Sequence, residues 1–143
     1  MKERKSWREK LAQSKDLPKT MVIPAPREVD ELMRQVPRGS LTTINEIRAA
    51  LARKHSTMMA CPLTTGIFAW IAAHAAEEAL AAGEKEFTPY WRTLKADGQL
   101  NAKYPGGIAG QKKLLEAEGH KVVKQGKVQV VADYERSLCD FGH

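Results

Sequence analysis

Residues 88–107 read Thr88-Pro89-Tyr90-Trp91-Arg92-Thr93-Leu94-Lys95-Ala96-Asp97-Gly98-Gln99-Leu100-Asn101-Ala102-Lys103-Tyr104-Pro105-Gly106-Gly107. Pro89 introduces two adjacent aromatic residues and an arginine. Asp97-Gly98 is typical of a tight turn, and the final Pro-Gly-Gly favours a loop that ends where a helix begins. The segment therefore predicts a structured loop between two helices, with an aromatic pair at its start.

The order of these features resembles the active-site segment of the methylated-DNA–protein cysteine alkyltransferase family. The residues that match the family's pattern are Pro89, Arg92, Asp97, Gly98, Gly106, Gly107, Glu118 and Gly119. Two positions differ. Tyr90 stands where the family has the cysteine that accepts the alkyl group, and Trp91 stands where it has the activating histidine.

These two differences exclude the family's reaction, which needs a thiolate and a neighbouring base. A phenol with an ordinary pKa of about 10 is a poor nucleophile at neutral pH, and an indole cannot act as a base. The chain resembles instead the alkyltransferase-like branch, whose members lack the cysteine and bind alkylated guanine without repairing it. The resemblance implies a non-catalytic protein with a lesion pocket formed by Pro89, Tyr90, Trp91 and Arg92. Arg92, with five donors in a tight loop, is predicted to hold backbone carbonyls or a carboxylate.

The composition bounds the class of protein. The 143 residues are 43% hydrophobic and 28% charged, with a formal net charge of +6, which fits one globular domain and permits a polyanionic partner. The two cysteines, Cys61 and Cys139, predict neither a disulfide framework nor a metal site. No cofactor is expected. We expect a cytoplasmic monomer with no membrane span and no signal peptide.

Proline and charge patterns divide the chain. Residues 1–25 are expected to form a basic arm, in which Trp7 and Leu11 could seat a short helix on the body. Residues 26–132 are expected to form the domain, and residues 133–143 a C-terminal tail. An arm that follows DNA phosphates is the alternative to a simple solvated helix.

Apolar spacing predicts helices over 26–39, 44–53, 62–82 and 107–118, and a β-hairpin over 121–131. Thr43 and Glu46 form a capping box for the second helix. The third helix is expected to bury a face with the residues Ile67, Phe68, Ile71, Ala72, Ala75 and Ala79. The fold class is therefore mainly α with a small β-hairpin: a winged-helix-like, helix-turn-helix DNA-binding domain.

The helix-turn-helix predicts the DNA contacts. The resemblance implies that its second helix enters the minor groove, where Gly66 stands at the position of an arginine that replaces an extruded base and Ile44 at that of a tyrosine. The predicted contacts from this helix are Thr64, Thr65, Gly66 and Ala69. The predicted phosphate contacts are Arg53, Lys54, Lys121, Lys124 and Lys127. Trp70 either stacks on a base or packs inside the protein.

Three hypotheses follow for the function. The first is a non-catalytic protein that binds double-stranded DNA, including alkylated guanine, in DNA repair. The second is a divergent domain of the same fold that binds a protein or small ligand and has no role at DNA lesions. The third is an enzyme of different chemistry with Tyr90 and Arg92 in its site, for which no nucleophile and base can be named.

Overall fold

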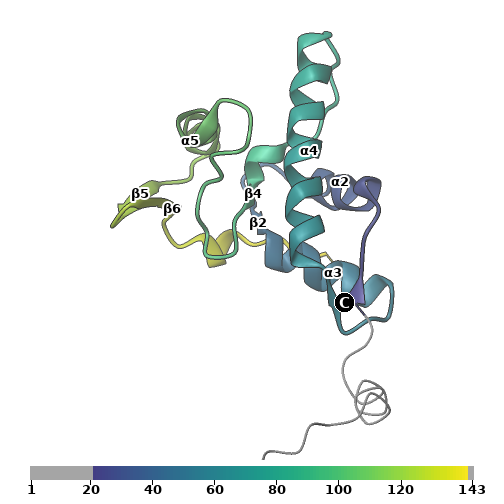
Figure 1. Cartoon of the computed structure of the whole chain (residues 1–143). Coiled ribbons are helices and arrows are strands. Elements are labelled where there is room, and N and C mark those ends of the chain that lie inside the picture. The colour runs from purple at the N-terminus through teal and green to yellow at the C-terminus, as the bar shows by residue number, and fades with distance from the viewer. Residues whose placement is uncertain (1–20, 142–143) are drawn as a thin grey trace, which may run out of the picture.

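The computed structural model describes residues 21–141, so the predicted helix around Trp7 and Leu11 lies outside the described residues. The elements are β1 (Met21–Val22), α2 (Pro26–Arg34), β2 (Thr42–Thr43), α3 (Ile44–Lys54), β3 (Met59–Ala60), α4 (Pro62–Ala81), the 3₁₀ turn η1 (Tyr90–Arg92), β4 (Thr93–Leu94), α5 (Gly107–Ala117), β5 (Val122–Gln125), β6 (Val128–Val131) and the 3₁₀ turn η2 (Tyr134–Ser137). The predicted mainly helical class with a small hairpin is confirmed (Figure 1).

Three helices form the larger core. α4 is the longest element, α2 and α3 pack against it, and its last turns extend beyond both of them (Figure 1). Val29 and Met33 from α2, and Ile47 and Leu51 from α3, are fully buried there. α3 begins as the sequence predicts, because the Thr43 side chain accepts a hydrogen bond of 3.2 Å from the Glu46 N–H.

The bounds predicted for α4 are right to within one residue, but its predicted core face is right only in part. Ala72 is buried and Phe68 packs against the core as predicted, whereas the other predicted residues are not among those that α4 buries. The residues that α4 buries are Thr65, Ala69, Ala72, Ala73 and Ala76. Ile71 is 45% exposed. Apolar residues surround this helix on nearly all sides, so hydrophobic periodicity could not indicate the inward face. Small residues face inward because they allow α2 and α3 to approach closely.

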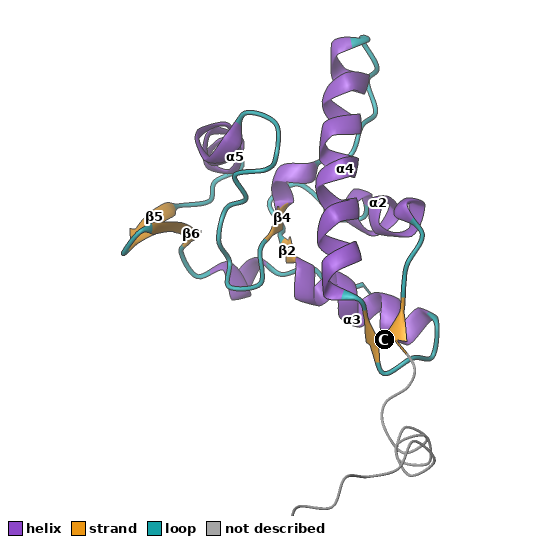
Figure 2. Cartoon of the chain, in the orientation of Figure 1, coloured by secondary structure: helices purple, strands orange, loops and turns teal. Residues whose placement is uncertain are grey.

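Short strand pairs connect distant segments (Figure 2). β1 pairs with β3, and β2 pairs with β4, both in parallel. The second pair places Thr42 opposite Thr93 and so fixes the Tyr90–Arg92 turn beside the start of α3. Pairs of two residues are too short to give a periodic sequence signal, and the sequence did not predict them.

A second, smaller core connects the hairpin to the helices. Its buried residues are Leu41, Leu94, Leu100, Leu115 and Val131. The predicted hairpin is confirmed as the antiparallel pair β5–β6. The chain then returns to the body, where the Leu41 N–H donates to the Ser137 carbonyl at 2.7 Å. Within residues 21–141, no helix is long and apolar enough to cross a bilayer.

Candidate nucleic-acid interface

The Tyr90–Arg92 turn is a 3₁₀ helix that follows Pro89. The Arg92 N–H donates to the Pro89 carbonyl at 3.2 Å, which closes the turn. The Thr88 hydroxyl donates to the Asp30 carboxylate of α2. Because one end is tied to α2 and the other continues into β4, the turn has a fixed position between the two cores.

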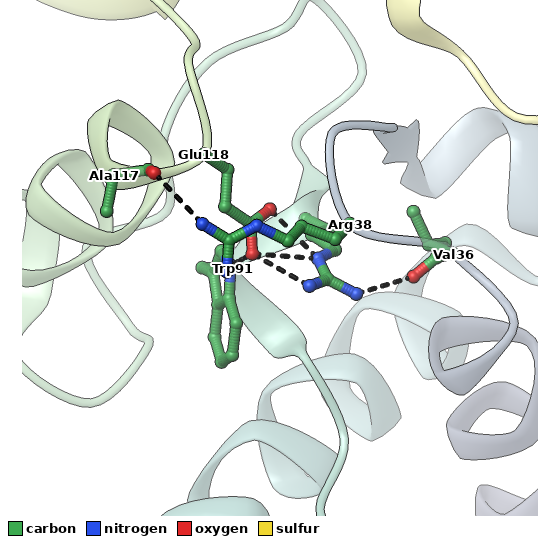
Figure 3. A network of polar contacts seen from close by, with 6 residues as sticks. Val36, Arg38, Trp91, Ala117 and Glu118 are labelled. Carbon is green, nitrogen blue, oxygen red and sulfur yellow. Dashed lines mark hydrogen bonds and ion pairs between the residues drawn. The ribbon is translucent and has the colours of Figure 1, made fainter.

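Arg92 holds this turn to Glu118, at the end of α5, and to Val36, after α2. Figure 3 shows Glu118 and Val36 together with Trp91. The Arg92 Nε donates to Glu118 Oε1 at 2.9 Å, and its Nη2 donates to Glu118 Oε2 at 2.7 Å. Its Nη1 donates to the Val36 carbonyl at 2.8 Å. The Trp91 Nε1–H adds a bond of 2.9 Å to Glu118 Oε2. The structural role predicted for Arg92 is therefore confirmed.

The charge of Glu118 is well stabilised. Its side chain is only 5% exposed. This burial would raise the pKa of Glu118, but the hydrogen bonds from Arg92 and Trp91 outweigh it and lower the pKa below its ordinary value. The pair is thus an ionised, nearly buried bridge between the aromatic turn and the end of α5.

Tyr90 is a packed residue. It is 5% exposed and lies edge-on to Trp91 at 5.3 Å and to Tyr104 at 5.5 Å between ring centroids. Burial, and then the charge of Glu77, raise the pKa of Tyr90, so the phenol stays neutral at physiological pH. Tyr90 and Trp91 border a pocket of about 290 Å³ at the far end of α4. Pro89 and Arg92 do not line it.

A larger hollow of about 470 Å³ lies at the start of α4, and we call it the α4 hollow. Its lining residues are Ile44, Asn45, Arg48, Pro62, Leu63, Gly66, Ile67, Trp70, Lys95, Ala96, Asn101 and Lys103. They come from α3, α4 and the loop after β4. The lining combines apolar side chains with three cations and two amides, which suits a polyanion whose flat bases can stack.

Two of the three cations of the α4 hollow, Arg48 and Lys103, are held by contacts within the protein. The Arg48 Nε donates to the Ala60 carbonyl at 2.9 Å, and its Nη1 donates to Asn45 Oδ1 at 3.2 Å. The Lys103 ammonium lies 5.6 Å from the centre of the Trp70 ring. Trp70 is only partly buried. Trp70 thus packs inside the protein and also borders the hollow, so packing and stacking on a base do not exclude each other for this residue.

Two positions singled out by the resemblance meet in this hollow. Ile44 and Gly66 both line it, although they come from different helices. No atom lies within 4 Å of the position that a Gly66 Cβ would take, so the hollow is open there. Leu63, one turn earlier on α4, is 70% exposed.

Other predicted contact residues lie elsewhere. Thr65 and Ala69 are wrong as DNA contacts, because both side chains are fully buried. The Thr65 hydroxyl donates instead to the Cys61 carbonyl at 2.7 Å. Thr64 is partly buried and does not line the α4 hollow. Of the four contacts predicted on this helix, Gly66 alone lines it.

The predicted phosphate contacts are exposed but lie away from the α4 hollow. Arg53 and Lys54 end α3, and the Lys54 ammonium pairs with Glu28 at 2.9 Å. The lysines of the hairpin segment are Lys121, Lys124 and Lys127. That hairpin lies beyond α5 from α4 (Figure 1).

The sequence did not single out the cations that do line the hollow, Arg48, Lys95 and Lys103. Arg48 could have been found, because it lies one helical turn after Ile44. The position of the two lysines depends on the path of a loop, for which the sequence carries no periodic signal.

The loop 101–105 separates the α4 hollow from the pocket beside Tyr90. His74 Nε2 lies 2.8 Å from the Lys103 carbonyl. Tyr104 is 3% exposed and fills the space next to Tyr90. Buried Gln111 accepts from the Asn101 N–H at 2.7 Å and donates to the Trp91 carbonyl at 3.1 Å. The loop is therefore tied to α4, to α5 and to the aromatic turn.

Among residues 21–141, no group of three or more His, Cys, Asp or Glu side chains could hold a metal ion.

Comparison with family models and with curated proteins finds no match for the sequence. Solved structures do match. One is S. pombe Atl1 in complex with damaged DNA containing O6-carboxymethylguanine, with a TM-score of 0.52 and 18% identity over 80% of this chain and 94% of that chain. Another is S. pombe ATL in complex with DNA, with a TM-score of 0.55 and 16% identity over the same shares of the two chains, 80% and 94%. The chain therefore has the fold of the alkyltransferase-like proteins.

Proposed function

We propose that this chain is a non-catalytic protein that binds double-stranded DNA, with a preference for alkylated guanine, and that the α4 hollow is its DNA surface. The observation that carries the proposal is the set of Arg48, Lys95 and Lys103 around the start of α4. It occurs in a fold whose solved relatives are in complex with DNA.

The chemistry of the hollow supports the contacts of a minor-groove protein. Such proteins read the groove with Arg, Lys, Asn or Gln and often insert an apolar wedge between base steps. Asn45 and Asn101 supply amides. Leu63 supplies an exposed apolar side chain, 70% accessible, one turn before Gly66. We assign to Leu63 the wedge, which takes the space that an extruded base leaves.

The extruded base would enter the hollow and stack on Trp70. Stacking on an aromatic side chain is worth about 1–3 kcal/mol per base. Trp70 suits this role better than Tyr90, because Trp70 borders the hollow that contains Gly66, whereas Tyr90 is packed behind Tyr104. The role of Tyr90 is then to shape the fold around the hollow.

Alkyl transfer is not part of the proposal, because Tyr90 and Trp91 offer neither a thiol nor a base. Incubation with alkylated DNA should leave the intact mass of the protein unchanged. A gain of one alkyl mass on any residue, Cys61 included, would overturn the non-catalytic assignment.

The binding test compares a plain duplex with a duplex containing O6-carboxymethylguanine, by fluorescence anisotropy at about 50 and 200 mM salt. Three neutralised phosphates give a slope of about −2.7 in log affinity against log salt, which is a loss of about 40-fold over this range. Leu63→Ala should weaken binding to the alkylated duplex and leave the salt slope unchanged. The control is Ile23→Ala, at a residue that is 65% exposed and lies outside the hollow.

A protein or small-molecule ligand of the same domain is the second candidate. This second candidate is supported instead of DNA binding if the parent protein shows no measurable affinity for either duplex at about 50 mM salt.

A further inference from the structure

The pocket beside Tyr90 is lined by residues that take no part in the proposed DNA binding. Its volume is about 290 Å³, and it shares no lining residue with the α4 hollow. We call it the aromatic pocket. The residues that define its character are Glu77, Leu80, Phe87, Tyr90, Trp91 and Leu114.

Three aromatic rings meet at this pocket at steep angles. The ring centroids of Phe87 and Trp91 are 6.3 Å apart with planes inclined by 53°. Those of Tyr90 and Trp91 are 5.3 Å apart with planes inclined by 84°. Three rings of different orientation therefore border one pocket. The negative face of an aromatic ring attracts a cation, and cages of such rings bind quaternary ammonium groups.

The indole is held in position before any ligand binds. Its Nε1–H donates to Glu118 at 2.9 Å, and the Trp91 carbonyl accepts from Gln111 at 3.1 Å. A side chain that is already ordered loses little conformational entropy on binding. The Arg92 guanidinium lies 5.4 Å from the centre of the Trp91 ring, but Glu118 neutralises its charge.

Glu77 gives the aromatic pocket a negative charge. It is the only charged side chain among the lining residues. Within residues 21–141, the Glu77 carboxylate makes no hydrogen bond or ion pair. The start of α5 also borders the pocket through Gly106, and its partial positive charge of about half a unit would favour an anion. The full charge of Glu77 outweighs it.

We propose that the aromatic pocket binds an alkylated ammonium group, with the aromatic faces around the alkyl shell and the Glu77 carboxylate opposite the charge. The cation belongs to a free small molecule or to a methylated lysine side chain, which share this chemistry. The proposal is independent of DNA binding.

The test is an NMR titration of the ¹⁵N-labelled protein, followed at the indole N–H resonance of Trp91 and assigned by its loss in Trp91→Phe. The probes are choline and its neutral analogue 3,3-dimethylbutan-1-ol, which has the same shape without the charge. A trimethyllysine peptide and the same peptide with unmodified lysine distinguish the two sources. We expect choline or the methylated peptide to saturate, with a dissociation constant on the order of millimolar or below.

Glu77→Gln should weaken the binding of the cation about tenfold, since it removes the only charge in the pocket. The matched control is Glu78→Gln, which makes the same change at the next, exposed residue of α4 and should leave the affinity unchanged. The proposal is overturned if the neutral analogue binds as well as choline, if the two glutamine variants behave alike, or if no cationic probe shifts Trp91.

Discussion

At the start of α4, a stripe of side chains that includes Gly66 and Trp70 faces Arg48, Lys95 and Lys103. Further along the same stripe, Glu77 and Leu80 face three aromatic rings instead. Gly66 and Glu77 are about 16 Å apart along the helix axis, at 1.5 Å per residue. One helix face therefore borders two surfaces of opposite sign.

This difference shows that the neighbours of α4, rather than α4 itself, decide what each end can bind. The helix contributes no Lys or Arg. Its cationic end takes its charge from α3 and from the loop after β4, and its other end takes its aromatic faces from the Tyr90–Arg92 turn. The loop 101–105, docked through His74 and Tyr104, keeps the two surfaces apart.

We expect Tyr104→Ala to have the largest effect on the separation of the α4 hollow from the aromatic pocket. The ring is 3% exposed and packs on Tyr90, so its removal leaves a large cavity between the α4 hollow and the aromatic pocket. We expect a loss of about 4 kcal/mol in the free energy of unfolding, measured in urea. Tyr104→Phe keeps the ring and removes only the buried hydroxyl. That control should change stability by less than about 1 kcal/mol. Equal stability of the two variants would show that the Tyr104 ring does not keep the two sites apart.

Arg92→Ala should disturb the aromatic end while it leaves the cationic end in place. It leaves the Glu118 carboxylate, 5% exposed, without its guanidinium partner. We expect a loss of about 3 kcal/mol in the free energy of unfolding. The indole N–H resonance of Trp91 should shift more than that of Trp70. Arg38→Ala is the control, because exposed Arg38 makes a single long bond of 3.4 Å to the Ala117 carbonyl. It should change stability by no more than about 0.5 kcal/mol, and a similar loss in both variants would contradict the assignment.

The smallest expected effect concerns the two thiols. The Thr64 hydroxyl and N–H lower the pKa of Cys61, at the start of α4, with a lesser contribution from Arg48. Burial raises the pKa of Cys139. A lowered pKa means a larger thiolate fraction below that pKa, so Cys61 should react with iodoacetamide at least about threefold faster than Cys139 near neutral pH. Peptide mapping by mass spectrometry over a series of pH values measures this ratio. Faster modification of Cys139 would contradict the predicted electrostatic difference.

Much of the fold could be predicted because the signals are local. Caps, prolines and glycines indicated the starts of α2, α3 and α4 and the end of α4. The helix α2 ends at Arg34, earlier than the predicted stop at residues 37–39. The pattern from Pro89 to Gly119 indicated both the aromatic turn and α5. The role of Arg92 followed from its donors and its place in a tight loop. These features depend on residues that are close in sequence.

The site could be predicted only in part. The face that α4 buries depends on how closely α2 and α3 approach, which a helix with apolar residues on nearly all sides does not encode. Lys103 reaches the hollow because the loop 101–105 docks on His74 and Gln111, and Lys95 reaches it from the turn that follows β4. Tyr90 and Gly66 border different pockets, and Tyr90 packs on the buried ring of Tyr104. Each of these depends on packing between distant segments.

The central claim is that the cations around the start of α4 hold DNA, and the most direct measurement compares two double variants by anisotropy over a range of salt concentrations. Lys95→Ala with Lys103→Ala removes two cations from the α4 hollow. Lys121→Ala with Lys124→Ala removes two exposed lysines of the hairpin segment. Both variants lose the same net charge. We predict that the first variant reduces the slope of log affinity against log salt by about 1.8, and that the second leaves it close to that of the parent. A reduced slope in the second variant alone would place the DNA on the hairpin and contradict the claim.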